Sequence, residues 1–501
     1  MKELNIAIAG LGVVGSEVAR ILTNEAEMLA SQAGMRLQLI AVSARSNRDR
    51  GFLMQGIDFV ADATQLAARK EVDIIVELIG GSEGVALDLC RSALKNGKHL
   101  VTANKAMIAH HGHELALCAE EQDVQLSFEA AVAGGIPAIK LLREGLSANR
   151  IEQVTGILNG TCNYILTEMT QTGRSFADVL AEAQAKGYAE AEPSFDVDGI
   201  DAAHKLAILA AIAYGQKIDF DQVQIAGIRA ISDIDIRFAA DLGYVIKLLG
   251  NAGRGAVPGV QPCLVAQDSQ LAKIDGALNA VAYSGSPVQS IVCTGPGAGD
   301  GPTASAVLAD IIDIARGQRA YPFGKPVASL EDKASHREIA PGRYYLRMMV
   351  EDQIGVLNAV TAILRDHDIS VESMLQKGRS DNAPVHLVFT THATKQQAVE
   401  AACDSLRGAS FIAVIFWHCQ LWQGNKFRTL NGRAKTHPIC RGFPIRGGLV
   451  FARLCLFHAG NAKTRRRAGK KNGYAARACL VFNLQWHRQR RHGWFFIAAP
   501  S

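Results

Sequence analysis

The sequence predicts an α/β protein that consists of a doubly wound parallel sheet, an α+β domain and a C-terminal ferredoxin-like module. Apolar strands alternate with helices over the first 135 residues, which is typical of a parallel sheet. A glycine-rich turn, GLGVVG, follows the first of these strands. From residue 344 the expected order is strand, helix, two strands, helix and strand, which is the order of a ferredoxin-like module.

The expected elements fall into four parts of the chain. The first domain, 1–135, has strands at 4–9, 37–45, 72–80, 99–104 and 124–132 and a helix at 16–30. A domain for catalysis and dimerisation follows at 136–320, where Pro137 opens a helix, since proline is tolerated in the first turn. The helix at 302–317 is expected to return to the first domain. A linker at 321–343 leads to the module at 344–415.

The charge balance changes near residue 416. The tail, 416–501, holds 17 of the 53 lysines and arginines and all four tryptophans, but none of the 48 acidic residues. It is either a basic nucleic-acid-binding extension or, as we prefer, a frameshifted or disordered end, because the change interrupts the last expected strand. A shifted frame predicts that another frame of the coding DNA completes that strand with an acidic end. We therefore expect no nucleic-acid partner.

Composition also bounds the location of the protein. No secretory signal precedes the first strand, and the longest apolar run, near 206–214, is too short to span a bilayer. The ten cysteines show no metal-type spacing, which favours reduced thiols. We expect a cytoplasmic protein with no membrane partner.

The turn GLGVVG is the dinucleotide fingerprint of a Rossmann-type sheet. Its glycines permit a tight turn and let a pyrophosphate approach the helix N-terminus. A bare GxGxxG is weak evidence, but this copy lies between the first strand and a helix, which is the required context. The expected cofactor contacts are Gly10, Leu11, Gly12, Val13, Val14 and Gly15.

The end of the second strand indicates which cofactor binds. An acidic residue there would bind the ribose 2′-OH of NAD, whereas this strand ends at Arg45, with Arg48 and Arg50 beyond it. Arginine suits a 2′-phosphate, so the sequence favours NADP. A solvated basic loop is the alternative, and use of NAD stays open.

Lys105 follows the strand at 99–104, at the edge where parallel sheets bind ligands, although a surface lysine would look the same. Three histidines lie a little further on, at His110, His111 and His113. We interpret them as the exposed end of a helix rather than as a metal site.

The segment 187–205 carries five acidic residues before its terminal Lys205. If a helix begins near Ile200, Asp201 and Lys205 share one face, as an ordinary surface pair would. The remaining acids would repel one another unless a cation binds. The α-ammonium of a small amino acid suits them better than a metal, since no histidine is suitably spaced. A lysine beside them can exchange a proton with a substrate oxygen.

This segment resembles the signature of homoserine dehydrogenases. Their pattern is matched at Pro193, Asp196, Val197, Gly199, Asp201 and Lys205; Glu192 replaces the usual Asp, Asn or Ser. The similarity extends to TANKA, EAAVAGGIP, GILNGTCNYIL and GPGAGDGPTA, and residues 344–415 are similar to an ACT domain. The resemblance implies NAD(P)-dependent interconversion of L-homoserine and L-aspartate 4-semialdehyde, in threonine, methionine and isoleucine biosynthesis.

The resemblance also implies roles for single residues. Lys205 is the acid/base, which donates a proton to the aldehyde oxygen as hydride reaches the carbon. Asp201 holds its ammonium group, and Lys105 faces both cofactor and substrate. Glu190 is a substrate ligand for the ammonium group, with Asp196 in the same network.

Two further sites are implied by the resemblance. Gly301, in the later glycine-rich loop, is expected to contact the cofactor. A monovalent cation such as Na⁺ is expected at the backbone carbonyls of Val132, Gly134 and Ile136, with Glu129 nearby, since hard oxygen ligands suit it.

The similarity to ACT domains implies feedback control, most simply by L-threonine. The effector is expected in the DQIGVL turn, at Asp352, Gly355 and Val356. A purely structural dimerising module is the alternative, and a homo-oligomer, dimer or tetramer, is expected. Two other functions stay open. They are an ACT-containing 2-hydroxy-acid dehydrogenase, which would need a catalytic His–Glu pair, and a non-catalytic amino-acid sensor.

Overall fold

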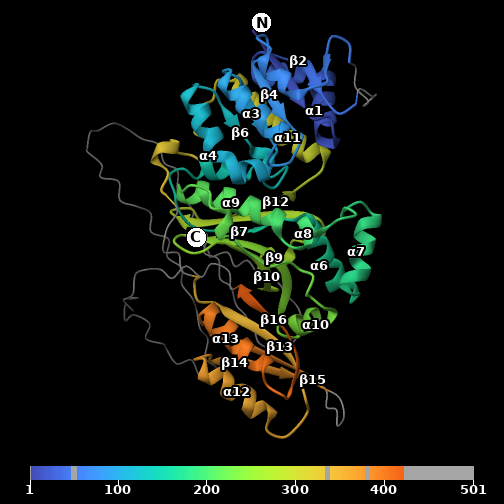
Figure 1. The fold of residues 1–501 in the computed structure, drawn as a ribbon, viewed down its shortest axis with the longest axis vertical. Helices are drawn as coiled ribbons and strands as arrows, with labels where there is room; N and C mark the ends of the chain where they lie inside the picture. Colours follow the sequence, from blue (N-terminus) through green and yellow to red (C-terminus); the bar gives the residue numbers. More distant parts are fainter. Residues whose placement is uncertain (1, 47–53, 333–338, 378–383, 423–501) are drawn as a thin grey trace, which may run out of the picture. The chain divides into compact units, whose positions relative to one another are not determined.

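The first sheet has six parallel strands in the order β3-β2-β1-β4-β5-β6 (Figure 1). The structure, a computed structural model, describes residues 2–46, 54–332, 339–377 and 384–422. The strands are β1 (Glu3–Ala9), β2 (Arg36–Ser43), β3 (Asp58–Val60), β4 (Ile74–Glu77), β5 (His99–Thr102) and β6 (Leu126–Ser127). The strand order reverses between β1 and β4, where sheets of this kind bind ligands. The predicted doubly wound sheet is confirmed.

The helices of this part differ from the expectation in detail. They are α1 (Val13–Asn24), α2 (Ala26–Ala33), α3 (Val85–Lys95) and α4 (Lys105–Glu121). The single helix expected at 16–30 is two helices, because Glu25 leaves the helical conformation, with φ −116° and ψ 25°. The strand expected at 124–132 is only two residues long, because a 3-10 turn begins at Glu129.

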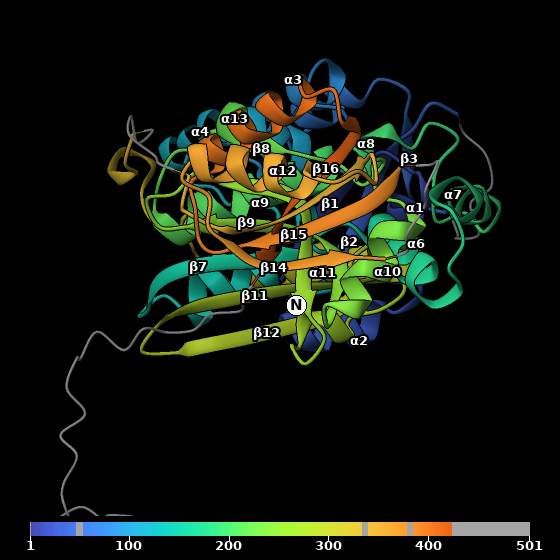
Figure 2. The same ribbon diagram turned by 90° about the horizontal axis from the view of Figure 1, so that it is seen from below.

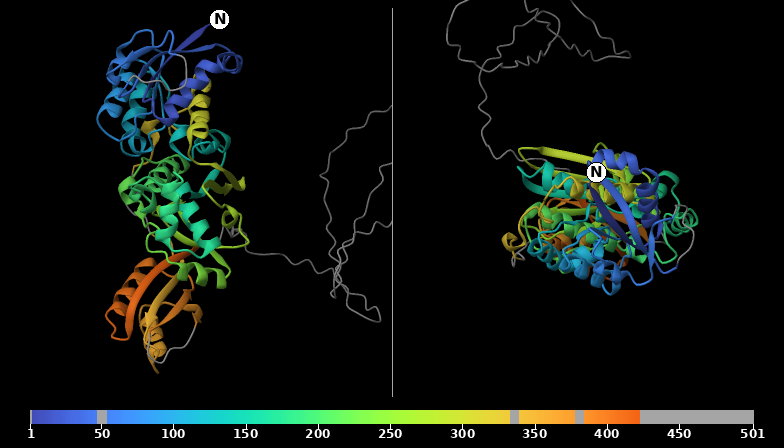
Figure 3. Two further views of the ribbon diagram at one scale, coloured as in Figure 1. Left: turned by 90° about the vertical axis from the view of Figure 1, so that its right-hand side faces the viewer. Right: turned by 90° about the horizontal axis from the view of Figure 1, so that it is seen from above.

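The helix α11 (Asp300–Ala315) packs against α1, although almost 280 residues of chain separate them. Its Val307 and Ile311 are buried in one apolar cluster with Ile8 and Val18. In the left view of Figure 3 this yellow helix lies among the blue segments of the first sheet. The later glycine-rich loop is thereby brought to the sheet that carries the GLGVVG turn.

The second sheet has the order β12-β11-β7-β9-β10, with β8 beside β10, and continues from β10 into the strands of the C-terminal module. Its first strands are β7 (Arg150–Ile157), β8 (Gln224–Ile225), β9 (Tyr244–Gly253), β10 (Gly259–Ala266), β11 (Leu278–Ser286) and β12 (Gln289–Pro296). Figure 2 shows β7, β11 and β12 side by side. The helices of this domain are α5 (Ala138–Lys140), α6 (Gly160–Thr172), α7 (Phe176–Ala185), α8 (Ser194–Val197), α9 (Ile200–Tyr214) and α10 (Asp233–Asp241).

Helix α9 carries the signature lysine into the interior. It begins at Ile200, as expected, and contacts α4, β7, β9 and β10. Its sequence is apolar on nearly all sides, so it is buried along most of its length. Asp201 and Lys205 are therefore only 4% and 8% exposed.

The C-terminal module has the expected βαββαβ order. Its elements are β13 (Arg343–Val350), α12 (Val356–Asp366), β14 (Val371–Gln376), β15 (Val385–Thr391), α13 (Gln396–Arg407) and β16 (Ile412–Trp422). β16 pairs antiparallel with β13 and, at residues 420–422, parallel with β10. The boundary expected after residue 415 thus falls within a strand. Residues 423–501, and with them most of the basic tail, lie outside the described residues, as do Arg48 and Arg50.

Within the described ranges, every helix falls short of the length or the apolar character needed to cross a membrane. Cys90, Cys118, Cys162, Cys263, Cys293 and Cys403 are free thiols.

Candidate active site

The chain leaves β1 in a turn that requires glycine. Gly10 has a φ of +99°, and a Cβ atom there would lie 2.4 Å from the carbonyl oxygen of Leu78. A Cβ at Gly15 would lie 1.9 Å from the carbonyl oxygen of Gly10. Gly12, the N-cap of α1, has open space around its missing Cβ, and no side chain caps the helix. An uncapped helix N-terminus with room before it fits a dinucleotide pyrophosphate.

The other expected cofactor residues lie around this turn. Val13 is 74% exposed, whereas Leu11 is buried. The N–H of Gly10 donates to the carbonyl of Ser43, the last residue of β2, so the exposed Arg45 follows close to the turn. Gly301 is the second residue of α11, and its N–H donates to the carboxylate of Asp300.

A buried carboxylate organises the ends of β4 and β5. Glu77 is 0% exposed and accepts hydrogen bonds from two backbone N–H groups of the following turn and from the hydroxyl of Thr102, at 2.6 Å. The hydroxyl of Thr102 accepts the N–H of Asn104, whose side chain caps α4. This network fixes Lys105 as the first residue of α4, at the carboxyl edge of the sheet.

The carboxylate of Asp201 lies between two lysines. Its Oδ2 is 2.8 Å from Nζ of Lys205, and its Oδ1 is 3.1 Å from Nζ of Lys105. Burial alone would raise the pKa of Asp201, but the ammonium groups of Lys205 and Lys105 hold that pKa well below its usual range. Asp201 is therefore ionised at neutral pH, and three of the predicted site residues form one cluster.

Lys205 has a second acceptor. Its Nζ donates to the carbonyl oxygen of Leu158 at 2.8 Å, and its side chain is 10% exposed. An ammonium group has three N–H donors. Within the described residues two of them are held by Leu158 and Asp201, which leaves one for a substrate. Lys105 is more open, with 31% of its side chain exposed and its Nζ 5.4 Å from the ring centroid of Phe195.

Most of the remaining acids of the signature segment have partners within the chain. Asp198 pairs with Arg229, with Nε 2.5 Å from Oδ1, and Glu192 accepts a backbone N–H two residues ahead. Asp196 accepts a hydrogen bond from Nδ2 of Asn159 at 2.8 Å. Burial and the charge of Asp201 raise the pKa of Asp196. Part of the expected repulsion among these acids is therefore relieved within the chain, by the guanidinium of Arg229 and the amide of Asn159.

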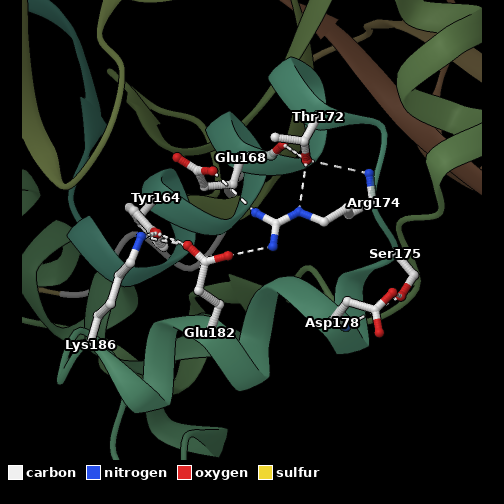
Figure 4. Close-up of polar contacts among 8 residues, drawn as sticks. All are labelled: Tyr164, Glu168, Thr172, Arg174, Ser175, Asp178, Glu182 and Lys186. Atoms are coloured by element: carbon white, nitrogen blue, oxygen red, sulfur yellow. Dashed lines mark hydrogen bonds and ion pairs between the residues drawn. The ribbon is translucent and has the colours of Figure 1, made fainter.

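Two glutamates lie apart from the cluster. Glu190 is exposed between α7 and α8, and in the described part of the chain no ion pair joins it to Lys105 or Lys205. Glu182, on α7, accepts hydrogen bonds from Lys186, Arg174 and the hydroxyl of Tyr164, which lower its pKa to about 2 (Figure 4). Glu182 therefore joins α7 to α6 and does not belong to the site.

The three histidines lie in the first half of α4, not at its end as expected. Only His110 is exposed, and its Nε2 lies 3.4 Å from Nε2 of the buried His204. His113 accepts the N–H of Ile218 at 3.0 Å. Over the ranges that the structure describes, no three His, Cys, Asp or Glu side chains are grouped to hold a metal ion.

The residues expected to bind a monovalent cation lie between β6 and α5. Glu129 is 3% exposed, and its two carboxylate oxygens accept backbone N–H groups at the start of α5, at 2.9 and 2.7 Å. Burial and the nearby Asp310 raise the pKa of Glu129 to about 7. The carbonyl of Ile136 accepts the N–H of Ala138. This donor set, one carboxylate and backbone carbonyls that include those of Val132 and Gly134, has the oxygen chemistry of a hard cation.

The expected effector residues open α12. Gly355 is its N-cap, with a φ of +95°, and Val356 is its first residue. Asp352 is half-buried in the preceding turn, and Ile354 between them is fully exposed.

The sequence prediction missed three buried polar residues of the site. They are Glu77, Asn159 and Asn279, whose partners lie 25, 42 and 121 residues away. The one local signal is that an asparagine before a helix, as at Asn159, is a common N-cap.

Comparisons with known proteins show to which family this chain is similar. Family profiles match at residues 10–129 (homoserine dehydrogenase, NAD binding domain), 137–312 (homoserine dehydrogenase) and 344–407 (ACT domain). Homoserine dehydrogenase of Neisseria gonorrhoeae is 43% identical over 416 residues, which are 81% of this chain and 95% of that protein.

Solved structures of homoserine dehydrogenases are similar over nearly all of their own lengths. A homoserine dehydrogenase from Thiobacillus denitrificans is 40% identical, with a TM-score of 0.79, over 84% of this chain and 99% of that one. A hyperthermophilic archaeal homoserine dehydrogenase in complex with NADPH is 28% identical, with a TM-score of 0.52, over 62% of this chain and 97% of that one.

Proposed function

Since this chain belongs to the homoserine dehydrogenase family, we propose that Lys205, Asp201 and Lys105 perform its reaction. The protein is an oxidoreductase that interconverts L-homoserine and L-aspartate 4-semialdehyde. A nicotinamide cofactor, when bound, supplies or accepts the hydride. The observation that carries the proposal is the buried carboxylate of Asp201 between two lysines, at the carboxyl edge of the nucleotide-binding sheet.

Lys205 is the proton donor and acceptor. During reduction its remaining N–H gives a proton to the aldehyde oxygen, so that a hydroxyl group forms rather than an alkoxide, and the lysine becomes a neutral amine. During oxidation the neutral amine takes the hydroxyl proton. Proton transfer by a positioned side chain contributes about 10²- to 10⁴-fold to a rate. Asp201 and the carbonyl of Leu158 keep Nζ in place through both directions.

The substrate is recognised by charge. Glu190, which is exposed, binds the α-ammonium of homoserine, and Asp196 lies in the polar network of Asn159 and Asp201. Lys105 faces cofactor and substrate with the exposed part of its side chain. Gly301 contacts the cofactor from the start of α11.

NADP is the preferred form of the cofactor. The turn from Gly10 to Gly15, with its open space at Gly12, holds the pyrophosphate, and Arg45 binds the 2′-phosphate, which a guanidinium suits in charge and geometry. A monovalent cation, Na⁺ by the chemistry of its donors, is held by Glu129 and the carbonyls of Val132, Gly134 and Ile136. It takes no part in proton transfer.

The ACT domain makes the enzyme sensitive to L-threonine, in the turn of Asp352, Gly355 and Val356. Gly355, at a φ of +95°, leads the chain into α12, and the positive end of the helix dipole lies at this turn. The working form is a homo-oligomer.

An assay of NADPH loss with L-aspartate 4-semialdehyde tests the function. We expect turnover with this aldehyde, slower turnover with NADH, and little or none with a 2-oxo acid such as pyruvate. L-Threonine lowers the rate, and Asp352→Ala weakens that inhibition while basal turnover is kept. Equal turnover of the 2-oxo acid would contradict the substrate, and an unaltered response in Asp352→Ala would contradict the effector site.

A further inference from the structure

A buried asparagine holds each of the two acceptors of Lys205. Nδ2 of Asn159 donates to Oδ2 of Asp201 at 2.9 Å, and Nδ2 of Asn279 donates to the carbonyl of Leu158 at 3.0 Å. The two amides are 5% and 1% exposed. They come from different elements, since Asn159 is the N-cap of α6 and Asn279 lies in β11.

The orientation of the Asn159 amide is fixed by the hydrogen bond that its oxygen accepts. Its Oδ1 accepts the N–H of Cys162 at 2.8 Å and so caps α6. Nδ2 must then face the two carboxylates, and its two hydrogens are shared between them: one goes to Asp201 and the other to Oδ1 of Asp196, at 2.8 Å. A single amide group therefore holds both acids and stands between their negative charges.

The position of Asn279 depends on a close approach of the later glycine-rich loop. A Cβ atom at Gly297 would lie 2.0 Å from Cγ of Asn279, so any larger residue there would displace the amide. The carbonyl of Leu158 accepts from both Asn279 and Lys205. Asn279 thereby fixes the direction of the Leu158 carbonyl. Unlike the carboxylate of Asp201, this carbonyl does not titrate.

We propose that Asn159 and Asn279 are positioning residues that hold the Lys205 ammonium group through its two acceptors, and that Asn159 also holds the carboxylates of Asp196 and Asp201 side by side. Neither amide touches Lys205 itself. The inference rests on the proposed role of Lys205 as proton donor, and it adds that this role depends on two neutral amides more than 100 residues apart.

The two amides differ in their effect on the pH dependence of kcat/KM. Asp196 and Asp201 repel each other, and the hydrogen bonds from Asn159 lower the pKa of both. The other charged or titratable groups that face these carboxylates are Lys105 from α4, Cys162 from α6, Asp198 beside α8, and His204 and Lys205 from α9. Loss of the Asn159 amide moves protonation of the acids to higher pH, whereas loss of the Asn279 amide does not.

Three matched truncations test the proposal: Asn159→Ala, Asn279→Ala and the control Asn163→Ala. Asn163 is a buried amide of the same helix α6, and its Nδ2 lies 2.9–3.1 Å from three carbonyls, those of Ile274, Gly276 and Leu278, none of which is an acceptor of Lys205. We expect the first two variants to lower kcat about tenfold or more, with KM for NADPH changed less than about twofold. The acid limb of kcat/KM moves up by roughly half a pH unit or more in Asn159→Ala only.

Asn159→Ser is the variant that separates the proposed role from loss of the fold. Serine also caps helices, so the start of α6 is kept, but it cannot donate to two carboxylates. It should retain the thermal stability of the wild type better than Asn159→Ala and still shift the acid limb. The proposal is overturned if Asn159→Ser and Asn279→Ala have wild-type kcat, or if Asn163→Ala reproduces the shift. A fully active Lys205→Ala would instead refute the role of Lys205, so the two failures are distinguishable.

Discussion

Nζ of Lys105 lies 3.1 Å from Oδ1 of Asp201, and this contact joins the nucleotide-binding sheet to the helix that carries Lys205. Lys105 opens α4, directly after β5, whereas Asp201 and Lys205 belong to α9. The carboxylate of Asp201 thus forms an ion pair with one lysine from each domain. The position of the proton donor therefore depends on how the two domains dock, which links cofactor binding to proton transfer.

The first prediction concerns this shared carboxylate. Asp201→Asn keeps the shape but removes the charge, so Lys205 loses its anchor and we expect kcat to fall on the order of 10²-fold. The pKa of Asp201 is depressed in the folded state. Its ionised form therefore contributes stability above the unfolded pKa of about 3.9, and this contribution is lost as pH falls toward the folded pKa. Urea unfolding should show the largest difference from the wild type near pH 7, and a pH-independent difference would contradict this.

The second prediction concerns the contact between the ACT domain and α10. Arg347 and Asp235 form a bidentate pair at 2.5 and 2.9 Å, with side chains 2% and 1% exposed. Arg347→Met leaves the Asp235 carboxylate buried without its cation, which should cost about 3–5 kcal/mol in the free energy of unfolding. Arg237→Met breaks an exposed pair with Asp233 on the same helix and should cost less than about 1 kcal/mol. Equal losses in denaturant unfolding would show that burial is not the cause.

The third prediction concerns Glu129, whose pKa is raised to about 7. The stability that comes from its neutral form is complete below the unfolded pKa of about 4.3 and is lost as pH rises through 7. Glu129→Gln should therefore gain stability relative to the wild type between pH 5 and 8. A bound Na⁺ favours the ionised carboxylate and should reduce this gain in sodium chloride compared with choline chloride. The same gain in both salts would contradict cation binding here.

The fourth prediction concerns cofactor choice. Arg45→Glu should raise KM for NADPH about tenfold or more, because a carboxylate repels the 2′-phosphate, and should leave KM for NADH unchanged or lower. Arg36→Glu is the control, since Arg36 is exposed at the first position of β2, the strand that Arg45 follows. Steady-state kinetics with both cofactors distinguish the variants. A parallel rise of both KM values in Arg45→Glu would show general damage to the site rather than lost recognition of the phosphate.

Local patterns predicted much of this site. The GLGVVG turn follows β1, as predicted. The four-residue spacing of Asp201 and Lys205 correctly predicted that they share one face of a helix, because strand and helix periodicity depend on near neighbours. The break at Glu25 was not predicted, since the apolar pattern continues through it.

Long-range partners could not be predicted in this way. Asp198 is neutralised by Arg229, and the acceptors of Lys205 are held by Asn159 and Asn279. Nothing near these residues in the sequence specifies such pairings, which depend on how α6, β11 and α9 pack. The sequence-based prediction therefore overstated how far this cluster of acids needs an external cation.

The most direct test of the account is kcat of Lys205→Ala in both directions, measured together with binding of NADPH. Lys217→Ala is the control, because Lys217 is a half-buried lysine shortly after α9 that pairs with Asp332. The account predicts that Lys205→Ala lowers kcat by on the order of 10² or more, that its affinity for NADPH changes little, and that Lys217→Ala is unaffected. A Lys205→Ala enzyme with wild-type turnover would contradict the assignment of the proton donor.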